Sequence, residues 1–281
     1  MKQLVVNADD FGFTRDVNRG IVKAHTAGIL TATTLMANGD AFDDAVLLGR
    51  DNPSLDVGCH LVLIGGQSVV DPGRRLPATI REMAQTVILG RLNPYDEFRA
   101  QIEKVLAAGI RPTHLDTHKH THLLPRVLDA VARLSQEFSI GWVRRPFDFP
   151  MSASSQAIPA VKRFTSRSLT IVRRRFHRVL EQHGCRTTDH FAGFQITGRF
   201  RSKELESLFH QLPDGSTEFM CHPGFCTSEL AAAQTRLKES RELELNALTD
   251  PTVRHALDTL GVVVVNYRDL ASNYSSKQST C

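Results

Sequence analysis

The chain has 281 residues, of which 41% are hydrophobic, and it carries a formal net charge of +4. A chain of this length can bury one large core, so a second domain is not required. The charge is too small to indicate nucleic-acid binding by itself, and we expect no nucleic-acid partner. The five cysteines are irregularly spaced, which argues against a disulfide framework and favours a cytoplasmic protein. No apolar run reaches membrane-spanning length, so we expect no stable membrane insertion.

Short β-branched runs alternate with amphipathic segments along the chain, which predicts repeated β-α units. Strands are expected at 3–8, 33–36, 55–63, 113–117, 141–144, 187–191, 216–221 and 262–266. Helices are expected at 14–27, around 42–46, at 94–108, from Pro125 onward, and near 159–183, 202–211, 228–245 and 251–260. Seven or eight such units imply a distorted or incomplete (β/α) barrel, with a doubly wound open sheet as the alternative. We expect one catalytic domain over residues 1–270 and a loose polar tail at 271–281.

Two adjacent aspartates, Asp9 and Asp10, follow the first predicted strand. Neighbouring carboxylates repel each other, so both need a positive partner or a raised pKa. A metal ion meets that need if one carboxylate binds it while the other handles protons. A lone pair of aspartates would more often cap the next turn.

A second polar cluster lies at His114-Leu-Asp116-Thr-His118-Lys-His120-Thr-His122. In an extended segment side chains alternate, so these four histidines and Asp116 would share one face. Imidazoles and a carboxylate on one face suit a divalent ion. Packing alone does not readily explain histidines at a period of two, and the pattern favours metal binding.

Other polar residues also follow predicted strands. His60 is a candidate metal ligand, and His222, followed by Pro-Gly, is a candidate acid or base pinned in a turn. Arg145 and Asp189 could hold substrate or act on a carboxylate. Each of these four signals is weak alone, since a histidine in a turn often only bonds its own backbone.

The segment 161–180 combines an apolar stripe with seven cations at the remaining helical positions. Such a helix could touch anionic lipid or nucleic acid. We favour the simpler interpretation that it covers the core and turns a basic face to solvent.

These motifs resemble the YdjC/ChbG carbohydrate deacetylase family, which includes the hopanoid-biosynthesis deacetylases called HpnK. The matching stretches are NADDFG at 7–12, GCHLVL at 58–63, THLDTHKHTH at 113–122, Asp189-x-Phe191-x-Gly193, EFMCHPG at 218–224 and the RELE stretch that begins at Arg241. The first and third are specific, and the others are not. Residues 64–95 and 150–186 match no motif.

The resemblance implies a TIM-like barrel related to the NodB-type polysaccharide deacetylases, with a divalent ion at its mouth. Mg²⁺ is the ion it implies first, with Zn²⁺ or another divalent ion as the alternative. Carried over residue by residue, it makes Asp10, His60 and His118 the metal ligands, Asp9 the general base and His222 the general acid. It also implies that Arg145 keeps Asp9 ionised, by analogy with related deacetylases. His120 and His122 are left as residues around the site or as replacements for His118.

The expected reaction is hydrolysis of the acetyl group from an N-acetylated sugar, either a chitooligosaccharide-like or a lipid-linked one, and a homodimer is compatible with the resemblance. A metal-dependent phosphoesterase or amidohydrolase is the main rival, because clustered His and Asp serve those reactions too, and a site with two metals would favour it. A catalytically silent sugar-binding protein is the other alternative. The presence of all five residues assigned to metal binding and catalysis argues against it.

Overall fold

In the part of the chain that the structure describes, an eight-stranded parallel sheet forms the centre of the protein. The computed structural model describes residues 1–151 and 172–278. The strands are β1 (Lys2–Phe11), β2 (Ala32–Leu35), β3 (Asp56–Leu61), β4 (His114–Thr117), β5 (Trp142–Val143), β6 (His190–Ala192), β7 (Gly215–Cys221) and β8 (Val262–Val264). Their order across the sheet is β5-β4-β3-β2-β1-β7-β6, and β8 pairs with the start of β1. Because the strands are parallel, their carboxyl ends meet at one rim.

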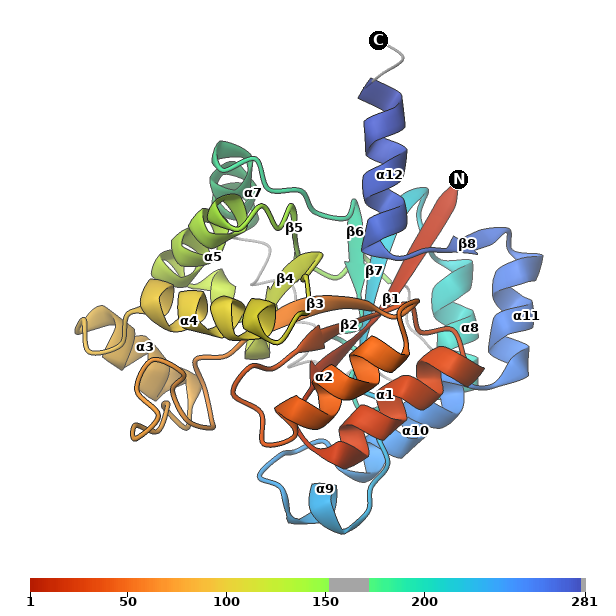
Figure 1. Ribbon diagram of the computed structural model, residues 1–281. Helices are drawn as coiled ribbons and strands as arrows, with labels where there is room; N and C mark the ends of the chain where they lie inside the picture. The colour runs from red at the N-terminus through yellow and green to blue at the C-terminus, as the bar shows by residue number, and fades with distance from the viewer. Residues whose placement is uncertain (152–171, 279–281) are drawn as a thin grey trace.

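The sheet curls until its two edges approach each other (Figure 1). After β5 the chain runs from one edge to the other: Val143 donates its N–H to the Arg186 carbonyl, and Phe149 donates to the Phe191 carbonyl in β6, at 2.8 and 2.9 Å. An isolated bridge joins Asp148 to Phe191. The expected distorted (β/α) barrel is therefore confirmed, and the alternative of an open doubly wound sheet is wrong.

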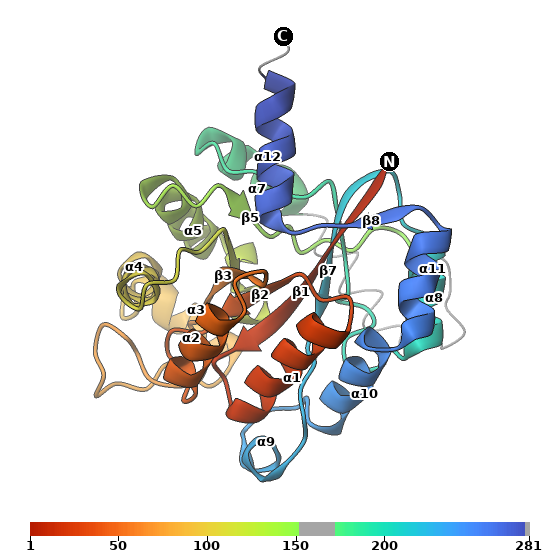
Figure 2. The same cartoon turned by 45° about the vertical axis from the view of Figure 1, so that its right-hand side comes forward.

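Helices cover the outside of the curled sheet (Figures 1 and 2). They are α1 (Arg15–Ala27), α2 (Phe42–Asp51), α3 (Ile80–Ile88), α4 (Pro94–Ala107), α5 (Pro125–Glu137), α7 (Arg173–Gln182), α8 (Ser202–His210), α9 (Ser228–Ala232), α10 (Glu239–Leu248), α11 (Pro251–Thr259) and α12 (Tyr267–Gln278). Their starts follow local chemistry. The Thr14 side chain accepts from the Val17 N–H and so caps α1, and Pro94 and Pro251 occupy the first turns of α4 and α11, where no N–H is needed.

The carboxyl-terminal part of the chain differs from the expectation in two places. The helix expected at 228–245 is two helices, α9 and α10. Residues 271–278, expected to be part of a loose tail, continue α12, which stands at the same end of the barrel as the amino terminus (Figure 2). Tyr267 and Leu270 in its first turn are buried with Val5 and Trp142 and close that end of the barrel.

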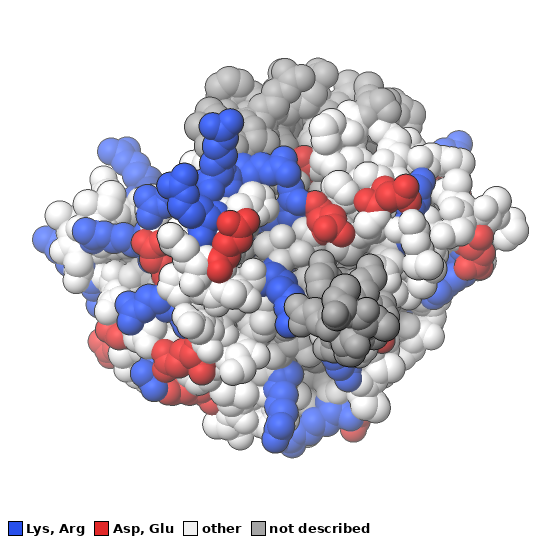
Figure 3. All heavy atoms as spheres, turned by 90° about the horizontal axis from the view of Figure 1, so that it is seen from above, with Lys and Arg blue, Asp and Glu red and all other residues white. Residues whose placement is uncertain are grey.

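The basic segment 161–180 is described only from residue 172 onward, so its first half lies outside the described residues. In α7, Phe176, Val179 and Leu180 are buried, whereas the arginines of its first turn are exposed. This part fits the interpretation of a helix that covers the core. Figure 3 shows Lys and Arg side chains gathered on the side where Figure 1 places α7.

Four of the five cysteines are described, and all four are free thiols, as the sequence predicted. None of the helices in the described ranges combines the length and the apolar character needed to cross a bilayer.

Candidate metal centre and active site

A bulge at the end of β1 places both adjacent aspartates at the same rim. The pairing of β1 with β2 shifts register between Ala8 and Phe11, and Asp10 has a φ of 72°. In a regular strand consecutive side chains point to opposite faces, so Asp9 and Asp10 would be separated. The bulge redirects one of them, and aspartate tolerates the left-handed conformation better than most residues. Both carboxylates now line one cleft.

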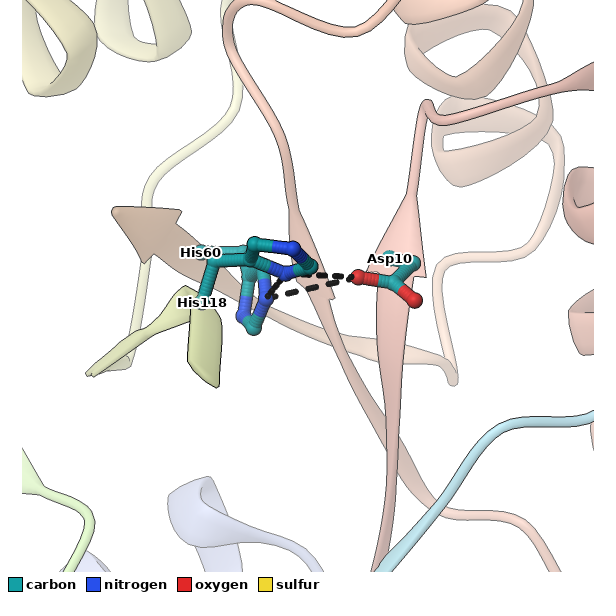
Figure 4. Close-up of side chains that lie close together, drawn as sticks. All are labelled: Asp10, His60 and His118. Carbon is teal, nitrogen blue, oxygen red and sulfur yellow. Dashed lines mark hydrogen bonds and ion pairs between the residues drawn. The ribbon is translucent and has the colours of Figure 1, made fainter. Parts of the chain in front are cut away.

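Asp10, His60 and His118 converge on one point, as Figure 4 shows. The Asp10 Oδ1 atom lies 3.4 Å from His60 Nε2 and 3.3 Å from His118 Nδ1, and the two ring nitrogens are 3.2 Å apart. Asp10 Oδ1 is buried and has no hydrogen-bond donor. One carboxylate oxygen and two imidazole nitrogens within 4.8 Å of one another are a suitable donor set for a divalent ion. The residues present therefore fit the metal that the resemblance implies.

Asp116 fixes the orientation of the His60 ring. His60 and Asp116 are register neighbours on β3 and β4, so their side chains share a face. The His60 Nδ1 atom is 2.6 Å from Asp116 Oδ1, and Thr34 Oγ1 donates to Asp116 Oδ2 at 3.2 Å. Burial lowers the pKa of His60, but Asp116, together with Asp9 and Asp10, outweighs burial and raises the pKa to about 9. Because Nδ1 lies against the Asp116 carboxylate, it keeps its proton, and Nε2, which faces Asp10, is the nitrogen that would lose its proton to bind an ion, an arrangement typical of metal-binding histidines.

A buried arginine, Arg144, holds the other aspartate. Its Nη1 and Nη2 atoms donate to the two oxygens of Asp9 at 2.7 and 2.6 Å. The same guanidinium reaches Asp116 Oδ2 at 2.7 Å and Glu218 Oε1 at 2.7 Å. Burial raises the pKa of Asp9, but Arg144, together with His60 and His222, outweighs burial and holds the pKa well below its usual value, so Asp9 stays ionised. Three carboxylates therefore share one cation.

The assignment of Arg145 as the residue that keeps Asp9 ionised is wrong. Arg144 and Arg145 are adjacent in an extended segment, so their side chains point to opposite sides. Arg144 points inward to Asp9, whereas Arg145 donates to the backbone carbonyl of Asp189. The Asp189 carboxylate accepts from the backbone N–H and hydroxyl of Ser216, each at 2.8 Å, and so ties the start of β7 to the residue that precedes β6. Neither Arg145 nor Asp189 lines the cleft.

The prediction that the histidines share one face is correct only for the first residues of the segment. β4 ends at Thr117, and Lys119 and His120 have φ values of 56° and 53°, which ends the alternation. His122 turns inward and bonds the Thr117 hydroxyl and the Arg144 carbonyl. His120 is 8% exposed, lies at the cleft and has an Nδ1 atom without a hydrogen-bond partner. His114 lies deeper, where its ring stacks on Tyr267 and its Nε2 bonds the Asn7 side chain.

His222 follows β7 and faces the aspartates from the opposite side of the cleft. Its Nε2 atom is 3.9 Å from Asp9 Oδ2. Burial lowers the pKa of His222 to about 4, so the imidazole is neutral at pH 7 before substrate binds. The structure thus brings together the five residues carried over from the family, and their roles remain predictions.

Helix α10 supplies two buried charged residues that sequence reasoning did not assign to the site. Arg241 donates from Nη2 to Asp10 Oδ2 at 2.5 Å, and Glu244 accepts the His222 backbone N–H at 2.6 Å. Burial raises the pKa of Asp10, but Arg241 and then His118 lower it well below its usual range. No local sequence pattern indicates that these two residues belong to the site. Only the resemblance of the RELE stretch to the family could have identified them.

The site lies at the bottom of a cleft with a volume of about 1440 Å³. Asp9, Asp10, His118 and His222 line its polar end. The loop after β3 and the start of α3 also line the cleft, with apolar residues that include Ile64, Leu76, Ile80 and Met83 and with the cation Arg75. This volume is large enough for an oligosaccharide or a similarly extended molecule.

Known proteins resemble the chain over nearly its whole length. A carbohydrate deacetylase from Geobacillus stearothermophilus is 31% identical over 273 residues, covering 94% of this chain and 96% of the relative. A carbohydrate deacetylase from Clostridium beijerinckii is 29% identical over 282 residues, covering 95% and 100%. A solved structure from Enterococcus faecalis, named as a candidate cellobiose-phosphate cleavage protein, superposes with a TM-score of 0.72 at 25% identity and covers 96% of this chain and 98% of its own. The family model of YdjC-like proteins matches residues 3–259, and the chain therefore belongs to the YdjC-like protein family.

Proposed function

We propose that this protein is a metal-dependent hydrolase that removes the acetyl group from an N-acetylated sugar. The observation that carries the proposal is the arrangement at the base of the cleft. An oxygen of Asp10 without a hydrogen-bond partner faces two imidazole nitrogens, and Asp9 is held ionised beside them by Arg144. The carbohydrate deacetylases that are about 30% identical to the chain supply the substrate class.

Asp10, His60 and His118 would hold the ion. When bound there, a divalent ion supplies a Lewis acid for the amide carbonyl and lowers the pKa of a water molecule. Asp9 accepts the proton of the attacking water, because it is ionised and its two oxygens are fixed by Arg144. His222 faces Asp9 at 3.9 Å and donates a proton to the departing amine nitrogen, which is a poor leaving group without it.

His222 must gain a proton before it can act as an acid. Its lowered pKa of about 4 leaves it neutral in the free protein. We infer that it receives the proton that Asp9 takes from water, because Asp9 Oδ2 is the near carboxylate oxygen. The two side chains then complete one proton transfer from the nucleophile to the leaving group, and the site returns to its starting charge.

The donor set bears on the identity of the ion. Two imidazole nitrogens and one carboxylate oxygen suit Zn²⁺ or another first-row ion, whereas Mg²⁺ prefers oxygen ligands. Mg²⁺ remains the prediction of the resemblance, and the donor chemistry favours Zn²⁺. A titration of the metal-free protein with both ions decides between them.

A second group of possible metal ligands lies beside the first, but an arginine already occupies it. Among the described residues, Asp9, His60 and Asp116 also bring ligand atoms within 4.8 Å of one another. Arg144 already occupies both of those carboxylates, and a cation in the same place would be repelled by the guanidinium. We therefore favour one ion per chain and a deacetylase over a phosphoesterase with two ions.

The test is acetate release from a panel of N-acetylated saccharides, with a divalent metal added and again after chelation. The panel includes chitin-type oligosaccharides and lipid-linked N-acetylglucosamine. We expect release that stops on chelation and returns with metal. A protein that retains stoichiometric metal but releases acetate from none of these sugars would refute the assignment.

A further inference from the structure

Helix α10 places a buried glutamate directly behind His222. Glu244 is 1% exposed, and its Oε2 atom accepts the backbone N–H of His222 at 2.6 Å. Its Oε1 atom accepts the backbone N–H of Gly198, also at 2.6 Å. Two charge-assisted hydrogen bonds from separate loops therefore fix the carboxylate in one orientation. Arg241, which binds Asp10, lies one turn earlier on the same face of the helix.

The two nitrogens of the His222 ring face different surroundings. Nε2 faces Asp9 across the cleft, at 3.9 Å from Oδ2. Nδ1 is buried, lies 4.0 Å from Glu244 Oε2 and makes no hydrogen bond. A buried ring nitrogen without a partner is costly, and here the nearby acceptor that could satisfy it is a carboxylate.

We propose that Glu244 is a positioning residue for His222, a role that rests on the proposed deacetylase function. Its carboxylate keeps Nε2 directed at the cleft and receives a hydrogen bond from Nδ1–H whenever the ring carries two protons. A buried imidazolium needs a fixed counter-charge, and Glu244 supplies one on the side of the ring away from the substrate. A ring movement of roughly 1 Å shortens the 4.0 Å separation to an ordinary hydrogen bond.

In the acid step, the proton on Nε2 passes to the amine nitrogen while the bond between that nitrogen and the acyl carbon breaks. The electron pair of the broken bond stays on nitrogen, where it binds the proton. The Nδ1–H bond is intact throughout, so Glu244 accepts a hydrogen bond but takes no proton. Its contribution is to make the doubly protonated ring available and aligned.

A purely structural role for Glu244 is the alternative, because the carboxylate also satisfies two backbone N–H groups. The two roles differ in their dependence on the leaving group. An amine leaving group needs an acid, whereas a nitrophenolate leaving group needs little help because it is weakly basic. Loss of positioning therefore slows amide hydrolysis selectively, whereas a structural fault slows both reactions alike.

The experiment compares Glu244→Gln with wild type on two substrates: the saccharide that releases most acetate in the panel, and 4-nitrophenyl acetate. His222→Ala is the reference for loss of the acid. Glu239→Gln, at an exposed position on the same helix, is the matched control. Bound metal and thermal stability are measured for every variant. We expect Glu244→Gln to lower kcat on the sugar by about 10- to 100-fold with KM little changed, and to lower the ester rate much less.

Equal losses on amide and ester in Glu244→Gln, alongside a selective loss in His222→Ala, would overturn the inference and leave the proposed function standing. Absence of selectivity in both variants would overturn the acid role of His222 and the inference with it. If Glu244→Gln does not fold, Glu244→Asp keeps the charge but withdraws it from the ring. A smaller, still amide-selective loss then supports the positioning role, and a loss equal on both substrates contradicts it.

Discussion

Replacement of Arg144 by lysine tests the charge arrangement beneath the cleft. The Arg144 guanidinium is 0% exposed and contacts the carboxylates of Asp9, Asp116 and Glu218 at 2.6–2.7 Å. A lysine ammonium is a point charge without the planar fork, so it cannot reach all three at these distances. At least one carboxylate then loses its partner while it remains buried. Breaking such a buried pair costs about 3–5 kcal/mol.

This loss is large enough to measure in two ways. For a domain of this size each kcal/mol lowers Tm by about 2–4 °C, so Arg144→Lys should melt about 10 °C below wild type. The activity should fall by about 100-fold, because Asp9 loses the bidentate contact that fixes both of its oxygens. Bound metal should be retained, since Arg144 contacts no proposed ligand of the ion.

Differential scanning calorimetry and acetate release provide these two values. Arg145→Lys is the matched control, because this neighbour donates to the Asp189 carbonyl and makes no contact with Asp9. We expect it to keep most of the activity. An Arg144→Lys protein with a Tm within 2 °C of wild type and undiminished turnover would refute the role given to the shared guanidinium.

Three further predictions concern single side chains. Asp9→Asn should abolish turnover but keep stoichiometric metal, and wild-type rates in this variant would remove Asp9 as the base. His118→Ala should lose metal and activity together, as measured by elemental analysis and acetate release, and full metal occupancy would contradict its role as a ligand. Burial raises the pKa of Glu218 to about 7, above its usual 4.5, so the stability it contributes is complete below pH 4.5 and is lost as pH rises through 7. Wild-type Tm should therefore fall relative to Glu218→Gln between pH 5 and pH 8, and parallel profiles would exclude this titration.

Local periodicity predicted most of the fold. β4, which begins at His114, has a strong local signal in its alternating run of polar residues. α4, which begins at Pro94, has one in the apolar stripe that follows the proline. The helix α3 was not predicted, because only Met83 and Val87 of its nine residues are buried and the apolar Ile80 and Ile88 are exposed. Ile80, Met83 and Val87 do stand at helical spacing, but a helix of nine residues that buries two side chains gives only a short signal in the sequence.

The candidate site was predictable where residues follow strands and not where tertiary contacts decide. Asp9 and His60 are found at strand ends, which a sequence reveals. The choice between Arg144 and Arg145 depends on which of two adjacent side chains points inward, and a two-residue strand leaves that open. Arg241 and Glu244 reach the site from a helix more than 15 residues along the chain from any other site residue, so only the folded structure reveals their contacts.

The central claim is that one ion held by Asp10, His60 and His118 enables hydrolysis of an N-acetyl sugar. The most direct test is to remove all metal, add back measured equivalents of Zn²⁺ or Mg²⁺, and follow acetate release from the best saccharide. The account predicts no release without metal, a linear rise with added ion and a plateau at one equivalent per chain. Full activity in the metal-free protein, or a rise that continues to two equivalents, would contradict it.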